Sequence, residues 1–287
     1  MTADYVRPRS IKEALEVRAA HPDWMVLAGG TDHMVSANHK SDPPGILDLW
    51  RLEELCFIRA DRDKVSIGAG ATWWEIQNHA VIGNRLTPLA AAAREIGALQ
   101  IQARGTLGGN VGTSSPVGDS LPALLALEAE IEVASTRGRR RINYAEYCTG
   151  YRTTKLAPDE LIVAAHLPLP EPTVSLVWRK VGTRRAQSIS KVMGAAAITV
   201  SGDVVTSARV AFGAIADRPI RVTAIEEAVK GQRIGNQAAE AARMAMRASI
   251  KPIDDVRSTA SYRREVAENL VARFFGQRGM IRRAVGP

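Results

Sequence analysis

The sequence predicts an α+β protein in which two α/β lobes enclose a ligand cleft and a smaller α+β domain follows. Helix-like and strand-like segments alternate through the first part of the chain. Two glycine pairs, Gly29-Gly30 and Gly108-Gly109, interrupt this alternation. Prolines at alternate positions, Pro168, Pro170 and Pro172, then form a linker, because proline breaks both helices and sheets.

Length and composition limit the class of protein. With 287 residues, 46% of them hydrophobic, the chain can bury one large core or two ordinary ones. No apolar run approaches the roughly 18 residues of a membrane-spanning helix, and the first five residues lack the apolar region of a signal peptide. Two cysteines are too few for a disulfide framework, so we expect a cytoplasmic protein.

The first lobe is predicted from local signals. Ser10 and Glu13 have capping-box spacing and open a helix that runs through about Ala20. The apolar run 24–28 has the length of a buried strand, which Gly29-Gly30 ends, and Thr31 could cap the next helix. A second strand is expected at 45–49.

The second lobe contains a longer series of segments. Thr72 and Glu75 repeat the capping-box spacing, and 86–96 is apolar on more than one face, as in a buried helix. The expected segments are a strand at 65–69, helices from Thr72, at 86–96 and at 121–127, and strands at 129–135 and 161–167.

After the proline linker the pattern changes to strands followed by helices. We expect strands at 174–181, 195–200, 204–205 and 208–212, a hairpin turn at 201–203, and helices at 220–229, 237–250 and 261–275. This order is typical of an antiparallel sheet with helices on one face.

The glycine pairs point to phosphate binding. Paired glycines let the backbone turn several N–H groups toward one point, and such a nest binds anions. The spacing differs from the G-x-G-x-x-G dinucleotide fingerprint, and a single strand followed by Gly-Gly is more often a bare turn. Two such clusters favour both phosphates of a dinucleotide between two loops.

Other chemistries find little support. The five histidines show no metal-ligand spacing: His21, His33, His39, His79 and His166. There is no H-E-x-x-H or G-x-S-x-G motif, and two cysteines cannot hold an all-cysteine iron–sulfur cluster. We therefore expect no metal and no catalytic side chain in this chain, and an organic cofactor to carry the chemistry.

The chain is basic, with a formal net charge of +8. Its densest basic run, 137–141, is interpreted as a hairpin turn between a strand at 130–134 and Ile142. Aromatic residues make up only 5% and are not interleaved with the basic ones. A solvated face, or a patch for an acidic partner subunit, is favoured over nucleic-acid binding.

The motifs also carry a family resemblance. Ala28-Gly29-Gly30-Thr31-Asp32 resembles the first flavin loop of the FAD-binding (medium) subunits of molybdenum hydroxylases, the family of xanthine dehydrogenase and carbon monoxide dehydrogenase. The run 100–110 is similar to the second flavin loop, and 115–119 supplies an acidic residue, Asp119. Further stretches match in order, at 149–154, 158–162, 185–192, 254–257 and 261–264.

The resemblance implies a fold and a set of binding residues. It implies a two-lobed FAD-binding domain of the PCMH/vanillyl-alcohol-oxidase type over 1–170, with lobes of about 1–58 and 59–170, and a CO-dehydrogenase-flavoprotein-type α+β domain over 174–287. Main-chain N–H groups of two loops would hold the pyrophosphate: Leu27, Ala28, Gly29, Gly30, Thr31 and Asp32, and Thr106, Leu107, Gly108, Gly109 and Asn110.

Four more residues align with family positions at the cofactor, each with a plainer alternative. Asp119 would accept hydrogen bonds from adenosine, or cap the helix that starts at Leu121. Ile96 and Ile162 would pack the cofactor, or belong to the core, and Lys180 would contact FAD, or be an exposed strand charge. This chain departs from the commoner family loop, Gln-Ile-Arg-Asn, at Gln102-Ala103. Any role of the arginine in that loop must therefore pass to Arg104 or is absent.

For function, the resemblance implies an electron-transfer subunit. Its partners would be a large molybdopterin subunit and a small subunit with two [2Fe-2S] clusters, in a dimer of heterotrimers. Electrons would pass from a substrate hydroxylated at molybdenum through the clusters to this FAD, then to NAD+ or another acceptor. A self-sufficient FAD-dependent oxidoreductase and a basic binding module without flavin remain as alternatives.

Overall fold

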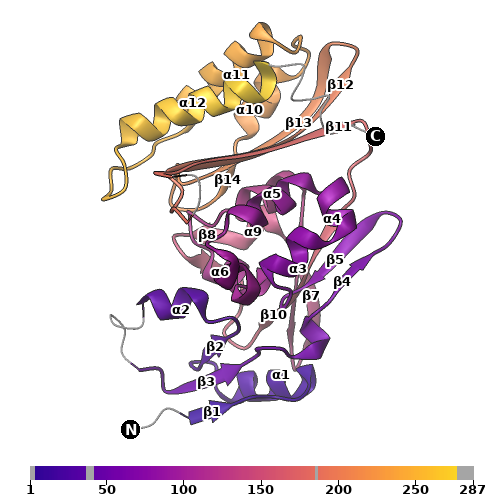
Figure 1. Ribbon diagram of the computed structural model, residues 1–287, viewed down its shortest axis with the longest axis vertical. Helices are drawn as coiled ribbons and strands as arrows, with labels where there is room; N and C mark the ends of the chain where they lie inside the picture. Colours follow the sequence, from indigo (N-terminus) through magenta and orange to yellow (C-terminus); the bar gives the residue numbers. More distant parts are fainter. Residues whose placement is uncertain (1–3, 37–41, 185–186, 277–287) are drawn as a thin grey trace.

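The computed structural model describes residues 4–36, 42–184 and 187–276 (Figure 1). His39, the first three residues and the segment after 276 lie outside the described residues, as do Arg185 and Ala186. No helix within the described ranges is long and apolar enough to cross a membrane.

The first lobe is a three-stranded parallel sheet with two helices. Its strands lie in the order β1 (Asp4–Val6), β3 (Gly45–Asp48) and β2 (Met25–Leu27), accompanied by α1 (Ile11–Ala20), α2 (Thr31–Ser36) and the short 3-10 helix η2 (Glu53–Leu55). The Ser10 hydroxyl accepts a hydrogen bond from the Glu13 N–H (3.2 Å), so the predicted start of α1 is confirmed. Strand β1 had no signal in the sequence analysis.

The second lobe is built on a five-stranded antiparallel sheet. Its order is β4 (Ile58–Ala60), β5 (Lys64–Gly68), β10 (Leu161–Pro168), β6 (Glu130–Ser135) and β7 (Gly138–Asn143). Around it lie α3 (Trp73–Asn78), α4 (Ala80–Arg85), α5 (Thr87–Glu95), α6 (Leu99–Arg104), α7 (Leu107–Thr113), α8 (Leu121–Ala126), α9 (Tyr144–Tyr147), β8 (Cys148–Gly150) and β9 (Thr153–Thr154).

Two sequence predictions in this lobe are confirmed. The Thr72–Glu75 capping box forms in full, with the Glu75 carboxylate accepting from the Thr72 N–H at 2.8 Å. Helix α5 is largely buried: Leu89, Ala92 and Ala93 have no exposed surface. Its alanine-rich sequence therefore reflects close packing on both sides.

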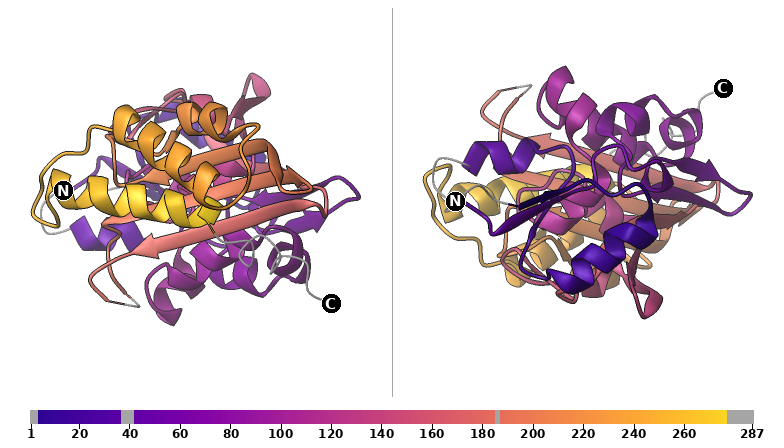
Figure 2. Two further views of the ribbon diagram at one scale, coloured as in Figure 1. Left: turned by 90° about the horizontal axis from the view of Figure 1, so that it is seen from above. Right: turned by 90° about the horizontal axis from the view of Figure 1, so that it is seen from below.

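The C-terminal part is a four-stranded antiparallel sheet under three helices. Its order is β11 (Val174–Val181), β12 (Val192–Ser201), β13 (Val204–Gly213) and β14 (Ile220–Arg221), with α10 (Thr223–Val229), α11 (Asn236–Ser249) and α12 (Ala260–Gly276) above one face (Figure 2). Ile220 starts a strand rather than the predicted helix, because it pairs with Phe212 on the free edge of β13.

The other face of this sheet packs on the second lobe. Helices α5 and α8 contact β11, β12 and β13 (Figure 1). Trp178, Ala195 and Ala211 belong to the same apolar core as the second lobe. The sheet is thus buried on both faces: its own helices cover one face, as the sequence predicted, and the second lobe covers the other.

The predicted hairpin is present, but its turn is shorter than the sequence interpretation had it: it lies at 136–137, and the basic run after Arg137 belongs to β7. Arg139, Arg140 and Arg141 lie on β7, opposite β6, because Ile142 pairs with Ile131 and extends the ladder. Their guanidinium groups make ion pairs with carboxylates of the same chain. Part of the positive charge is therefore neutralised within the molecule.

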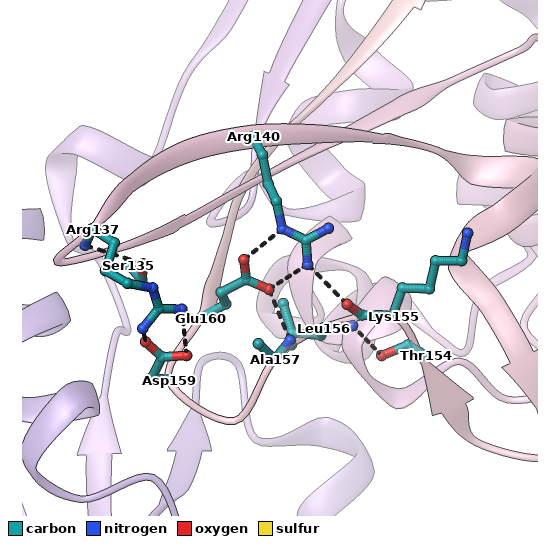
Figure 3. Close-up of polar contacts among 9 residues, drawn as sticks. All are labelled: Ser135, Arg137, Arg140, Thr154, Lys155, Leu156, Ala157, Asp159 and Glu160. Atoms are coloured by element: carbon teal, nitrogen blue, oxygen red, sulfur yellow. Dashed lines mark hydrogen bonds and ion pairs between the residues drawn. The ribbon is translucent and has the colours of Figure 1, made fainter.

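One of these ion pairs fixes the loop before β10 (Figure 3). Arg140 donates to both oxygens of Glu160, at 2.6 and 2.7 Å, and to the Lys155 carbonyl at 2.9 Å. Glu160 also accepts from the Ala157 N–H at 2.8 Å. Its carboxylate is therefore shared between the edge strand and its own loop, just ahead of Ile162.

We expect Glu160→Gln to destabilise the protein by about 1–3 kcal/mol, because a charged and mostly buried acceptor is lost. The hydrogen bond from Arg140 holds the pKa of Glu160 below its usual value. Because its pKa is lower in the folded protein, ionised Glu160 adds to the free energy of unfolding at pH values above the unfolded pKa of about 4.3. This contribution is lost as pH falls through the pKa of Glu160 in the folded protein. Urea unfolding at several pH values measures both effects. Asp159→Asn, at the exposed pair with Arg137, is the control and should cost less.

Candidate cofactor-binding site

The structure brings the two glycine clusters together, although they come from different lobes. A Cβ atom on Gly29 would lie 1.7 Å from the Arg104 carbonyl oxygen. In return, Arg104 Nε lies 3.4 Å from the Gly29 carbonyl oxygen, and a Cβ atom on Gly105 would lie 3.4 Å from Thr31 Oγ1. The loops therefore meet main chain to main chain, as expected for two loops around one ligand.

The two glycines of each pair have different surroundings. Gly29 and Gly108 approach other backbone: a Cβ on Gly108 would lie 2.8 Å from the Ala69 carbonyl oxygen. Gly30 and Gly109 face more open space. A Cβ there would meet only Leu27 Cδ1 at 3.7 Å and Thr106 Oγ1 at 3.1 Å, respectively. The first glycine of each pair allows the loops to pack, and the second leaves backbone accessible to a ligand, so the residues fit a bound pyrophosphate.

The N–H groups of the second loop are already used within the chain. Leu107 donates to the Ala71 carbonyl (3.0 Å) and Gly108 to the Ala69 carbonyl (2.8 Å). Gly109 donates to the Thr106 hydroxyl (3.1 Å), and Asn110 to the Thr106 carbonyl (3.1 Å). The second loop therefore offers exposed backbone at Gly109 rather than a nest of free donors. The sequence analysis expected free main-chain N–H groups in both loops, and in the second loop the N–H groups of 107–110 are bonded within the chain.

Two arginines connect the lobes at this point. Arg104 lies over the Trp50 ring, 4.0 Å from its centroid, which gives this arginine a bridging role. Arg152, in a left-handed conformation with φ of 51°, pairs with Asp32 of the first loop at 3.6 Å. The sequence analysis missed Arg152, because nothing local indicates a partner so far away in the chain.

A second group of predicted residues meets between the second lobe and the C-terminal sheet. Lys180 Nζ donates to Asp119 Oδ2 at 2.6 Å and to the carbonyl of Glu95, which precedes Ile96, at 3.2 Å. Only 4% of the Lys180 side chain is exposed, so the alternative of an exposed strand charge is wrong. Helix α8 begins with Ser120 as its N-cap and has no side-chain cap, so Asp119 does not cap it.

The two groups are connected by hydrogen bonds. The Ser120 hydroxyl donates to the Asn110 side-chain oxygen at 2.6 Å, so the residue next to Asp119 holds the second glycine loop. Ile162 lies against α7, where a Cβ on Gly112 would be 3.5 Å from its Cδ1. Ile96 and Ile162 are partly buried hydrophobic residues at the edge of the main core.

The electrostatics of Asp119 reflect its burial. Burial raises the pKa of Asp119, while Lys180 and the hydroxyl of Ser190, which donates at 2.5 Å, act in the opposite direction. Ser190 was missed by the sequence analysis as a site residue. Within the described ranges, no three His, Cys, Asp or Glu side chains could hold a metal ion.

Most of the chain matches two known families. Residues 1–170 match the FAD binding domain in molybdopterin dehydrogenase, and residues 179–278 match the CO dehydrogenase flavoprotein C-terminal domain. The chain therefore belongs to the FAD-binding subunits of the molybdopterin dehydrogenases, which are oxidoreductases.

Relatives of this class match along nearly their full length. The chain is 27% identical to the nicotinate dehydrogenase FAD-subunit of Eubacterium barkeri, over 95% of this chain and 94% of that one. It is 29% identical to the glyceraldehyde dehydrogenase medium chain of Sulfolobus acidocaldarius, over 94% and 96%. A structure of carbon monoxide dehydrogenase from Hydrogenophaga pseudoflava superposes with a TM-score of 0.91 at 27% identity, over 95% of this chain and 96% of that chain.

We expect Gly109→Val to lower FAD affinity at least about tenfold, which corresponds to about 1.4 kcal/mol. The branched side chain would cover the exposed backbone at Gly109, and its Cβ would lie only 3.1 Å from Thr106 Oγ1. FAD content of the purified protein and fluorescence titration of the apoprotein measure the effect. Gly83→Val is the matched control, since its side chain meets nothing within 4 Å and lies in helix α4. Equal flavin content in the two variants would contradict the assignment of Gly109.

Proposed function

We propose that this chain is the FAD-carrying electron-transfer subunit of a heterotrimeric molybdenum hydroxylase. Its partners are a large molybdopterin subunit and a small subunit with two [2Fe-2S] clusters, and two heterotrimers form an (αβγ)2 assembly. The chain passes electrons from the clusters to NAD+ or another acceptor. The meeting of the two glycine loops, in a chain that matches FAD or medium subunits end to end, carries this proposal.

The relatives support a role separate from substrate hydroxylation. Similar subunits are named for nicotinate, glyceraldehyde and caffeine dehydrogenases, although the chains match over similar lengths. One type of subunit thus accompanies different substrate chemistries, as a relay would.

We divide the chain into two domains, an FAD-binding domain over 1–170 and a second domain over 174–287. Bound FAD would supply electron transfer that no side chain can perform. The pyrophosphate would lie over Gly30 and Gly109, between the loops 27–32 and 106–110.

The remaining contacts are assigned to the residues between the two domains. Lys180, Ile96 and Ile162 would contact the cofactor. Asp119 would accept from adenosine through a lone pair that Lys180 and Ser190 leave free, since a carboxylate has about four acceptor sites.

The alternatives are less well supported. A self-sufficient FAD oxidoreductase needs an acid–base group beside the flavin, and the charged groups described there, Asp119 and Lys180, are bound to each other. A basic module without flavin fits poorly with arginines of β7 that pair with carboxylates of their own chain. We place the protein in the cytoplasm, in keeping with its two free cysteines.

We expect FAD to be bound without a covalent bond, because no histidine or cysteine stands beside the loops in an attachment motif. Acid precipitation of the purified holoprotein should release the yellow chromophore into the supernatant. A chromophore that remains with the precipitate would contradict non-covalent binding, and a colourless protein after reconstitution with FAD would contradict the proposed function.

We also expect the isolated FAD-loaded chain to accept electrons from dithionite without hydroxylating any substrate. Hydroxylation with oxygen from water needs a metal-oxo centre, which the partner subunits provide in this proposal. Turnover of N-heterocycles and aldehydes should be compared for the isolated chain and for the complex with its co-expressed partners. Equal turnover by the isolated chain would favour the self-sufficient oxidoreductase.

A further inference from the structure

We propose that Ser190 is a positioning residue for the flavin: it holds Asp119, and through Asp119 it fixes the Lys180 ammonium group toward the cofactor. This inference rests on the proposed function, because it requires FAD at this site. It adds a residue from the loop before β12, inside the family-like stretch 185–192, to which the sequence analysis assigned no role at the site.

The geometry divides the carboxylate of Asp119 between two donors. Ser190 has no exposed surface, and its hydroxyl donates to Asp119 Oδ1 at 2.5 Å. Lys180 Nζ donates to the other oxygen, Oδ2, at 2.6 Å. The main-chain carbonyl of Asp119 is held as well, by the Trp178 indole N–H at 3.1 Å. Asp119 is therefore held by Trp178 and Lys180 of β11 and by Ser190, which lies in the segment leading into β12.

Lys180 keeps one donor available. An ammonium group has three protons, and the described contacts use two of them, on Asp119 and on the Glu95 carbonyl. The third proton has no acceptor among the described residues, although only 4% of the side chain is exposed. A buried donor without a partner is costly, so this site is suited to an acceptor atom of a bound ligand beside Ile96.

Ser190 matters because burial opposes the charge on Asp119. Burial raises the pKa of this carboxyl group, and the bonds from Lys180 and Ser190 lower it. Among the described residues, Lys180 of β11 is the charged side chain that acts on Asp119, and the Glu95 carbonyl faces Lys180 from the end of α5. Without the serine hydroxyl, Asp119 protonates at a higher pH and its ion pair with Lys180 is lost.

The first experiment uses the full chain without FAD. Ser190→Ala should lower the stability to urea most at neutral pH, and the difference from wild type should shrink as pH falls, because protonated Asp119 no longer needs the bond. In an Asp119→Asn background the pH dependence should disappear. Lost packing alone would give a difference that is independent of pH, and that result would overturn the inference.

The second experiment uses the complex with its co-expressed partners, with flavin bound. Ser190→Ala should release FAD faster on dialysis than wild type, and the difference should grow as pH is lowered, because protonated Asp119 then no longer holds the Lys180 ammonium group. Ser135→Ala, a buried serine of the β6–β7 hairpin, is the control and should match wild type. FAD release that matches wild type at every pH in Ser190→Ala would overturn this inference alone. A wild-type complex without flavin would overturn the proposed function, and this inference with it.

Discussion

The arrangement of the site depends on one main-chain contact between lobes, that of Gly29 with Arg104. The space between them is too small for any side chain, because a Cβ on Gly29 would lie 1.7 Å from the Arg104 carbonyl oxygen. This contact sets the first glycine loop against the end of α6, and the second loop follows directly after it. Gly108 makes the corresponding close approach to Ala69. With the two glycine loops packed this closely, Gly30 and Gly109 are the glycines whose backbone a ligand can reach.

The C-terminal sheet is placed by a second constraint, the buried ion pair between Lys180 and Asp119. A buried pair gives little net stability, since desolvation offsets much of the attraction. Any other arrangement of the two parts would leave a buried charge without its partner, which is far more costly. Together with Trp178 and the apolar face on α5 and α8, the pair therefore selects one position of this sheet. Predicted cofactor residues from three distant parts of the chain meet there.

Both constraints suit a relay protein. The predicted cofactor residues lie where lobes and domains meet, and within the described ranges no metal cluster accompanies them. In the proposed function, chemistry on a substrate belongs to the partner subunits, and the relatives are named for different substrates. The arginines of β7 belong to a different part of the molecule and serve the fold, as the Arg140–Glu160 pair shows (Figure 3).

The sequence by itself determined the features that depend on neighbours along the chain. The caps at Ser10 and Thr72 and the buried helix α5 follow from spacing within a few residues, and the glycine pairs identify the loops. Only the tertiary structure decided that Lys180 is buried, that Ser190 bonds Asp119 71 residues away, and that the N–H groups of the second loop are already bonded. Strand β14 likewise depends on the free edge of β13. The physical reason is that a hydrogen bond or ion pair across such a separation leaves no periodic trace in the sequence, whereas a cap or an apolar face does.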